Sequence, residues 1–175
     1  PVALFDRPAD GGDPILLTDP NGDRLAAVDF GSDSQFSVAG AHGDVVFGYF
    51  IEPVDRDPGK NDPLAFLIHG GPQGSFDDHF HYRWNPQIYA GHGYAVVMID
   101  FHGSTGYGQA FTDAINGDWG GAPFEDLMKG LDDVLRRHSW IDPDRVAAAG
   151  ASFGGYMINW IQGKTDRFAA LVCHD

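Results

Sequence analysis

Apolar residues in this 175-residue chain fall into short, mostly uninterrupted runs separated by more polar stretches. Each run has the length of a strand, and runs without alternation are typical of strands buried on both faces of a parallel sheet. The predicted strands are residues 45–51, 64–68, 94–99, 145–149 and 168–173. A cluster of Asp, Pro and Gly at residues 55–63 predicts a tight hairpin-like or edge connection between the first two strands.

Helical periodicity lies between the later runs. The clearest helix is predicted over Pro123–His138, where apolar residues recur on one face: Phe124, Leu127, Met128, Leu131, Val134 and Leu135. A second helix should begin just after Ser152 and end at Gly163, and a shorter one should end at Gly91. Strands that alternate with helices predict the α/β class, with a mainly parallel sheet flanked by helices and right-handed crossovers.

Residues 1–43 differ from the rest of the chain. They are rich in Asp, Gly and Pro, and their apolar runs, such as 15–17 and 25–28, are short. This stretch is expected to be a peripheral strand or a linker that leads into the α/β domain.

Composition narrows the possible classes of function. Eleven Lys and Arg residues stand against 25 Asp and Glu residues, so the net charge is −14 and the isoelectric point is about 4.6. Phosphate backbones and anionic lipids attract basic surfaces, so this balance argues against both as partners. No stretch approaches the about 18 apolar residues of a membrane helix. Cys173 is the single cysteine, so neither an intramolecular disulfide nor a cysteine-based zinc site is expected.

The strongest chemical signal is the Gly-x-Ser-x-Gly pattern within residues 150–155, with Ser152 at its centre. By itself the pattern is weak. Here it follows the predicted strand 145–149 directly and precedes a predicted helix, which is the strand–turn–helix context of a nucleophile elbow. The alternative is a glycine-rich loop with an incidental serine.

A nucleophile elbow explains each small residue of this motif. The serine occupies a strained turn that exposes its hydroxyl, and side chains two positions before and after it would collide, hence Gly150 and Gly154. Gly155 would allow the helix to approach a neighbouring strand closely. The backbone N–H of Phe153, at the start of the helix, would then point at a developing oxyanion.

A second motif, residues 69–72 (His-Gly-Gly-Pro), follows the predicted strand 64–68. Ligands of open α/β sheets bind beyond the carboxyl ends of the strands, so both motifs should open onto one crevice. Pro72 has no N–H, so a hydrogen-bond donor to substrate must come from Gly71 or Gly70. A simple turn would also explain the Gly-Gly-Pro sequence.

Other candidate sites have weaker support. Residues 77–81 could hold a metal through Asp77, Asp78, His79 and His81, but no closing ligand is evident, so no metal site is expected. Residues 103–108 form a mobile loop or a pocket wall. The aromatic side chains of Phe80, Tyr82 and Trp84 fit core or domain contacts better than a cofactor site. A dinucleotide-binding glycine pattern is absent.

Together these motifs resemble the catalytic α/β-hydrolase domain of prolyl oligopeptidase-type serine peptidases, in particular the acylaminoacyl-peptidase and dipeptidyl-peptidase V-like branch. The matching pieces keep the family's order: residues 36–53, an entry strand, then 69–72, 100–108, 118–121, 142–145, 150–155 and 173–175. His102 departs from the pattern, because many members carry Arg at that position. No role of that arginine is transferred.

The resemblance implies that Ser152 is the nucleophile and that the amides of Phe153 and Gly71 form the oxyanion hole. It implies short peptide substrates, no cofactor, and a β-propeller before this domain. Residues 1–35 would be the linker or the last propeller strand, and residues 36–175 the N-terminal part of the peptidase domain. A periplasmic or secreted location fits the resemblance, and a cytoplasmic one stays open.

In α/β-hydrolases the triad runs Ser, Asp, His along the chain, so the acid and base are expected beyond residue 175. His174 could touch substrate but follows the wrong strand for the general base. The chain is therefore expected to be a nearly inactive fragment of a serine peptidase, truncated after the strand that follows the nucleophile helix. Two alternatives remain. One is an esterase- or lipase-like hydrolase, and the other is a non-catalytic module that pairs with a partner or forms a homo-oligomer.

Overall fold

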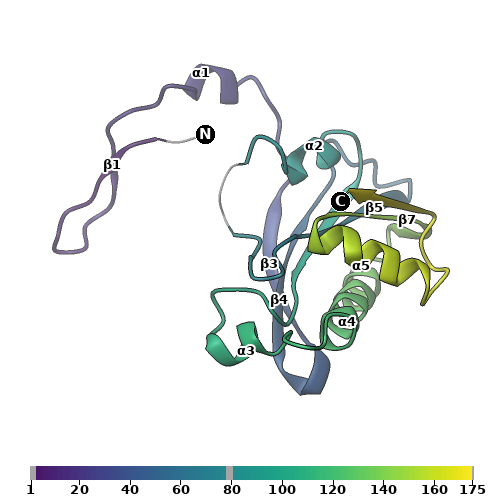
Figure 1. Cartoon of the computed structure of the whole chain (residues 1–175). Helices are drawn as coiled ribbons and strands as arrows, with labels where there is room; N and C mark the ends of the chain where they lie inside the picture. Colours follow the sequence, from purple (N-terminus) through teal and green to yellow (C-terminus); the bar gives the residue numbers. More distant parts are fainter. Residues whose placement is uncertain (1–2, 78–80, 175) are drawn as a thin grey trace.

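A computed structural model describes residues 3–77 and 81–174, and its centre is a six-stranded sheet (Figure 1). Across the sheet the order is β3 (Asp33–Ala39), β4 (Val45–Ile51), β6 (Ala95–Asp100), β5 (Asp62–Ile68), β7 (Ile141–Ala151) and β8 (Ala170–His174). Strands β6, β5, β7 and β8 run parallel, while β3 and β4 are antiparallel additions at one edge. The predicted α/β fold with a mainly parallel sheet is confirmed.

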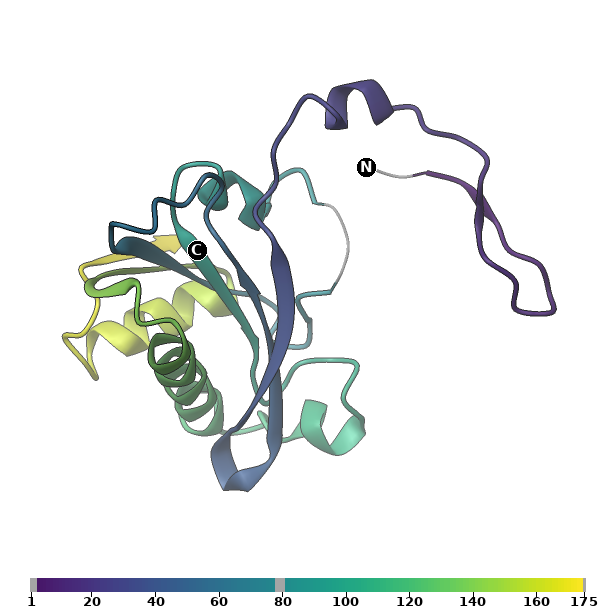
Figure 2. The ribbon, with the colours of Figure 1, turned by 180° about the vertical axis from the view of Figure 1, so that it is seen from behind.

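Helices cover both faces of the sheet, which is why its central strands are apolar throughout. Helices α4 (Ala122–Arg137) and α5 (Phe153–Gln162) lie over one face, where their apolar sides join the main core (Figure 2). Helix α2 (Pro86–Ala90) packs on the other face. Strand β6 shows the division, since Val97 and Ile99 belong to the first core and Val96 and Met98 to the second.

Two expectations about the entry to the sheet are wrong. Residues 36–53 are not one strand but a hairpin, in which β3 and β4 are joined by a short 3₁₀ turn, Ala41–Gly43. The connection across residues 55–63 is not hairpin-like, because β4 pairs with β6 and not with β5. Both errors arise because turn residues indicate that the chain reverses but not which strand lies beside which.

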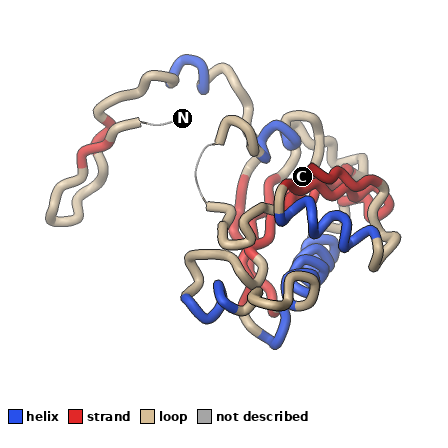
Figure 3. Tube along the Cα trace, in the orientation of Figure 1, coloured by secondary structure: helices blue, strands red, loops and turns tan. Residues whose placement is uncertain are grey.

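Residues 3–30 lie apart from the sheet (Figure 3). They contain a two-stranded ladder of β1 (Phe5–Asp6) and β2 (Ile15–Leu16), followed by helix α1 (Gly22–Leu25). A group of large apolar side chains here is exposed to solvent: Leu4, Phe5, Ile15, Leu16, Leu17, Val28 and Phe30. The contrast with the buried strands of the sheet agrees with the peripheral character predicted from composition.

Candidate active site

The carboxyl ends of the parallel strands bring the two glycine motifs together at one edge of the sheet. Strand β5 ends at Ile68, just before His69, and its neighbour β7 ends at Ala151, just before Ser152. In the register of these strands Ile68 lies opposite Gly150. The two motifs therefore lie beside each other at one edge of the sheet, where their positions in the sequence predict a shared crevice.

Ser152 has the backbone of a strained turn between strand β7 and helix α5. Its φ and ψ angles are 57° and −122°, in a region that non-glycine residues rarely occupy. The residue is exposed although its neighbours on both sides are partly or fully buried. The turn thus leaves Ser152 exposed at the carboxyl edge of the sheet, as the motif predicts.

The glycines beside Ser152 are required by close backbone contacts. A Cβ atom on Gly150 would lie 2.5 Å from the carbonyl carbon of Gly154, and one on Gly154 would lie 2.3 Å from the Ile68 carbonyl oxygen. A Cβ on Gly155 would lie 2.7 Å from the carbonyl oxygen of His174 in β8. The predicted collision across the turn is confirmed for Gly150, whereas Gly154 is confined by the end of β5, and the close approach of the helix to the neighbouring strand is confirmed at Gly155.

The glycines after β5 lie directly against the serine turn. A Cβ on Gly70 would lie 3.2 Å from Ser152 Cβ and 3.7 Å from Ser152 Oγ. Gly71, the next residue, has a φ of 133° and joins Pro72 through a cis peptide bond. Because a side chain at Gly70 would fill the space beside the hydroxyl, these glycines leave room for a substrate carbonyl at that point.

Phe153 begins helix α5, and its side chain anchors the turn in the core. The ring is 3% exposed and packs against Phe101, Trp119 and Tyr156, with ring centroids 5.3–5.5 Å away. N–H groups in the first turn of a helix have no partner within the helix and carry partial positive charge. Among the described residues no side chain caps this end of the helix. The Phe153 N–H is therefore available as a hydrogen-bond donor beside Ser152.

His69 is held by hydrogen bonds through both ring nitrogens. Nδ1 lies 2.8 Å from the Gly70 carbonyl oxygen, and Nε2 lies 2.9 Å from Ser104 Oγ. The side chain is 8% exposed, and burial lowers its pKa from 6.5 to about 4, although the bond to Gly70 opposes this shift. The imidazole is accordingly neutral at physiological pH.

The shifted pKa of His69 predicts how acid affects folding. The unfolded chain binds more protons than the folded one between pH 4 and 6.5, so the contribution of His69, on the order of 3 kcal/mol, is complete above pH 6.5 and lost as the pH falls toward 4. As the pH falls from 6.5 to 4, the free energy of unfolding of His69→Gln, measured with urea, should fall less than that of the wild-type protein. Burial raises the pKa of Asp100 to about 6, so protonation of Asp100 favours the folded state as the pH falls. This effect is present in both proteins and cancels in the comparison. Parallel pH profiles for the two proteins would contradict the prediction.

None of the described histidines hydrogen-bonds to the Ser152 hydroxyl. His174 touches the serine turn only through its backbone, whose carbonyl accepts the Ser152 N–H at 2.9 Å. Its ring instead lies edge-on to Trp84, with centroids 6.0 Å apart. The His174 side chain is thus turned toward Trp84, and no hydrogen bond joins its ring to the Ser152 hydroxyl among the described residues.

Sequence reasoning assigned no role to a hydrogen-bonded cluster that joins the buried His102 and Asp126 to the exposed Asp44. Its Nδ1 lies 2.6 Å from Asp126 in α4, and its Nε2 lies 3.2 Å from Asp44 at the start of β4. Asp126 also accepts the backbone N–H of Ala41 and of His102, and burial raises its pKa. The cluster joins α4 to the β3–β4 turn, and no signal in the sequence indicated it, because Asp126 lies outside the apolar face predicted for this helix and its partners are distant along the chain.

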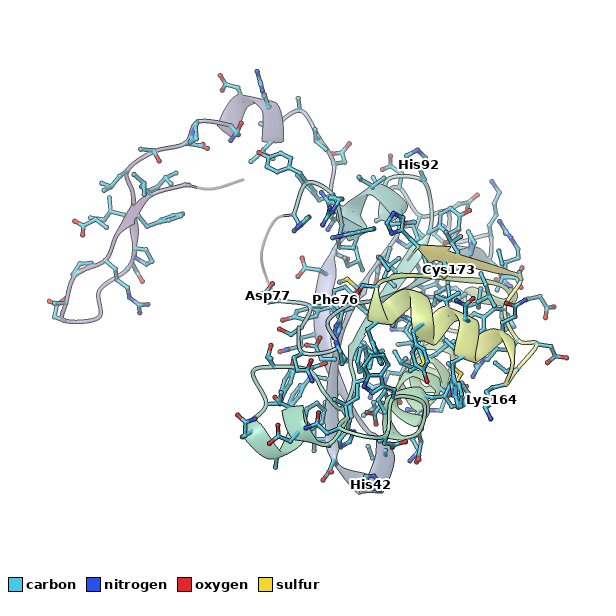
Figure 4. The ribbon with its side chains drawn as sticks, in the orientation of Figure 1. His42, Phe76, Asp77, His92, Lys164 and Cys173 are labelled. Atoms are coloured by element: carbon cyan, nitrogen blue, oxygen red, sulfur yellow. The ribbon has the colours of Figure 1, made fainter. Side chains whose placement is uncertain are left out.

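The metal hypothesis at residues 77–81 falls largely outside the described residues, which omit 78–80. Figure 4 labels Asp77 at the end of the described part of that loop, beside Phe76. Within residues 3–77 and 81–174 no group of three or more potential metal-ligating side chains comes together. In the same part of the chain, no helix is long and apolar enough to cross a membrane.

A serine at a positive-φ turn between a parallel strand and a helix defines the α/β-hydrolase class. Comparison with known proteins then narrows the class. The sequence model of the prolyl oligopeptidase family matches residues 80–175, more than half of the chain. The chain belongs to this family.

Curated relatives and solved structures agree with the assignment. The chain is 49% identical over 138 residues to dipeptidyl-peptidase 5 of Schizosaccharomyces pombe, and 52% identical over 132 residues to a probable dipeptidyl-peptidase 5 of Arthroderma benhamiae. These matches cover 78% and 74% of this chain but only 20% and 18% of the relatives. An acylaminoacyl peptidase of Pyrococcus horikoshii superimposes with a TM-score of 0.86 at 28% identity, over 92% of this chain and 26% of that one. The chain thus spans about a fifth of the length of these curated relatives.

Proposed function

We propose that this chain carries the nucleophile and the oxyanion hole of a serine peptidase. The observation that carries the proposal is the exposed Ser152 in its strained turn, with the glycines of the His69–Pro72 loop against it. A hydroxyl presented this way is suited to attack a carbonyl carbon, and the small residues beside it leave room for one. Membership of the prolyl oligopeptidase family supports the same chemistry.

The reaction proceeds through an acyl-enzyme. Ser152 Oγ attacks the carbonyl carbon of the scissile amide, and its proton passes to a general base. The negative charge that forms on the carbonyl oxygen is stabilised by the N–H groups of Phe153 and Gly71. Collapse breaks the C–N bond, the protonated amine leaves, and water then hydrolyses the ester on Ser152.

The base and the acid that orients it come from residues outside this chain. This part of the proposal rests on the described histidines, none of which reaches the Ser152 hydroxyl. It is also consistent with the relatives, of which the chain covers a fifth or less. The active species is therefore a protein of the relatives' length that contains this chain. We refer to it as the full-length protein.

Short peptides are the substrates that the relatives' names favour. The names dipeptidyl-peptidase and acylaminoacyl peptidase both describe enzymes that act on peptides. Residues 1–35 would be the linker or last strand of an upstream β-propeller that limits access to the crevice. The exposed apolar side chains around β1 and β2 support a covering domain at that position.

One observation favours a second candidate, a non-catalytic pairing module. Strand β8 has a partner only on its β7 side within the described residues, and Val172 on it is 58% exposed. An edge of this kind can pair with another chain. In that case the 19.0 kDa chain would form a dimer or a complex in solution, without any reaction at Ser152.

Labelling with a fluorophosphonate separates these candidates. We expect the full-length protein to be labelled at Ser152, as located by intact mass and peptide mapping, and the 175-residue chain to be labelled far more slowly, because none of its described histidines hydrogen-bonds to the hydroxyl. Ser152→Ala is the control and should take up no label. A full-length protein that resists labelling would refute the peptidase proposal. Hydrolysis of short acyl esters without hydrolysis of dipeptidyl amides would instead identify an esterase.

A further inference from the structure

We propose that Ser104 is a positioning residue that orients the Gly71 amide of the oxyanion hole through His69 and the Gly70 carbonyl. The inference rests on the proposed function, because it concerns how the donor of that reaction is aimed. Ser104 lies in the loop after β6, 48 positions before the nucleophile in sequence. It is fully buried, with a relative exposure of 0%.

The hydrogen bonds leave one arrangement of protons along this chain of groups. The Gly70 carbonyl can only accept, so His69 Nδ1 carries the proton and donates to it at 2.8 Å. In the neutral ring Nε2 must then accept, and its partner is the hydroxyl of Ser104 at 2.9 Å. Ser104 therefore sets the orientation of the His69 ring, and that ring holds the Gly70 carbonyl.

Holding the Gly70 carbonyl also aims the Gly71 N–H. The two groups belong to one planar peptide unit, and this bond is trans, since the cis bond lies one residue later. In a trans peptide the C=O and N–H point in opposite directions, so rotation of one moves the other. At a glycine with φ of 133°, the backbone itself offers little resistance to such a rotation.

The rest of the contact between the two loops strengthens this arrangement. The Thr105 N–H donates to the Gly74 carbonyl at 2.9 Å, and the Phe76 N–H donates to Asp100 Oδ1 at 2.7 Å. The His69 ring is stacked on Phe101, with centroids 4.2 Å apart. The loop that carries Gly71 is thus fixed at both ends to the segment after β6, and Ser104 makes the attachment nearest to Gly71.

The test is the kinetics of Ser104→Ala in the full-length protein with a chromogenic dipeptidyl amide. We expect kcat to fall about tenfold with KM within about twofold, because the Gly71 donor acts on the charge formed in the transition state. Inhibition by a dipeptidyl boronate, whose tetrahedral adduct occupies the oxyanion hole, should weaken in the same proportion. Ser139→Ala, an exposed serine between α4 and β7, is the matched control and should leave both values unchanged.

Two further variants separate positioning from general damage. His69→Asn keeps an N–H near the Nδ1 position, but its side chain is too short to place an acceptor at the Nε2 position that Ser104 contacts, so adding Ser104→Ala to it should cost less than about twofold more. Ser104→Thr keeps the hydroxyl and should recover most of kcat. Independent losses in the double variant, or unchanged kcat and boronate affinity in Ser104→Ala, would overturn the proposal.

A readout besides activity distinguishes failure of this inference from failure of the proposed function. Amide hydrogen exchange in residues 69–76 should be faster in Ser104→Ala than in wild type, whether or not the protein hydrolyses peptides. Unchanged exchange would overturn the positioning role. A wild-type protein without turnover, but with the expected change in exchange, would refute only the peptidase proposal.

Discussion

Replacing Ser152 with alanine should lower kcat of the full-length protein by about 10⁴- to 10⁶-fold, which is the range for loss of a serine nucleophile. Alanine fits the same backbone turn, because only the hydroxyl is removed. The substrate pocket and the oxyanion donors remain, so KM should change little. Steady-state hydrolysis of a dipeptidyl amide measures the loss.

The matched control for this variant is Ser139→Ala. Ser139 is exposed and precedes β7, at the opposite end of that strand from Ser152. Its loss should leave kcat unchanged. If Ser152→Ala kept more than about one hundredth of wild-type kcat, Ser152 would not be the nucleophile and the acyl-enzyme mechanism would fail.

Adding one methyl group at Gly154 should disrupt the serine turn. The new Cβ would lie 2.3 Å from the Ile68 carbonyl oxygen and 3.1 Å from that of His69, and both are backbone atoms that cannot rotate away. Overpacking against fixed atoms costs about 3 kcal/mol or more, and here it forces apart the helix and the strand that hold Ser152 and the His69 loop. Gly154→Ala should therefore lower the urea midpoint of unfolding and slow fluorophosphonate labelling in the full-length protein.

Gly163→Ala, just after the same helix, separates this effect from the general cost of replacing a glycine. A Cβ at Gly163 would lie 3.6 Å from the Trp160 carbonyl oxygen, an ordinary contact, and its φ of −82° suits any residue. Its urea midpoint and labelling rate should match those of wild type. Equal effects of the two alanines would show that the tight contact at Gly154 is not what maintains the turn.

Local chemistry was sufficient to predict the serine turn from sequence. The Gly-x-Ser-x-Gly spacing after a strand indicates the turn by itself, although in the structure only Gly150 is confined from within the motif, by Gly154, while Gly154 and Gly155 are confined by the ends of β5 and β8. The buried strands and the long helix were also predictable, because periodicity and uninterrupted apolar runs reflect burial directly. Strand β3 was not predicted as separate from β4, although Phe36 and Val38 alternate with polar residues as an edge strand requires.

Contacts between distant segments were decided only by the tertiary structure. The order of the strands places β6 between β4 and β5, so the turn cluster at residues 55–63 misled the hairpin prediction. The loop 103–108, expected to be mobile or a pocket wall, lines a cavity through Tyr107, and it also contributes Ser104 to the hydrogen bond with His69, 35 positions away. His102 likewise meets Asp44 across 58 positions.

There is a physical reason why some features follow from the sequence and others only from the tertiary structure. Sequence alone determined the features that depend on a residue and its near neighbours: the α/β class, the main helices and the nucleophile motif at Ser152. Which loops touch at the carboxyl edge of the sheet depends on strand order, and strand order is a property of the whole packed core. The aiming of the Gly71 amide through Ser104 and His69 belongs to that second kind, because its parts become neighbours only when β6 lies beside β5.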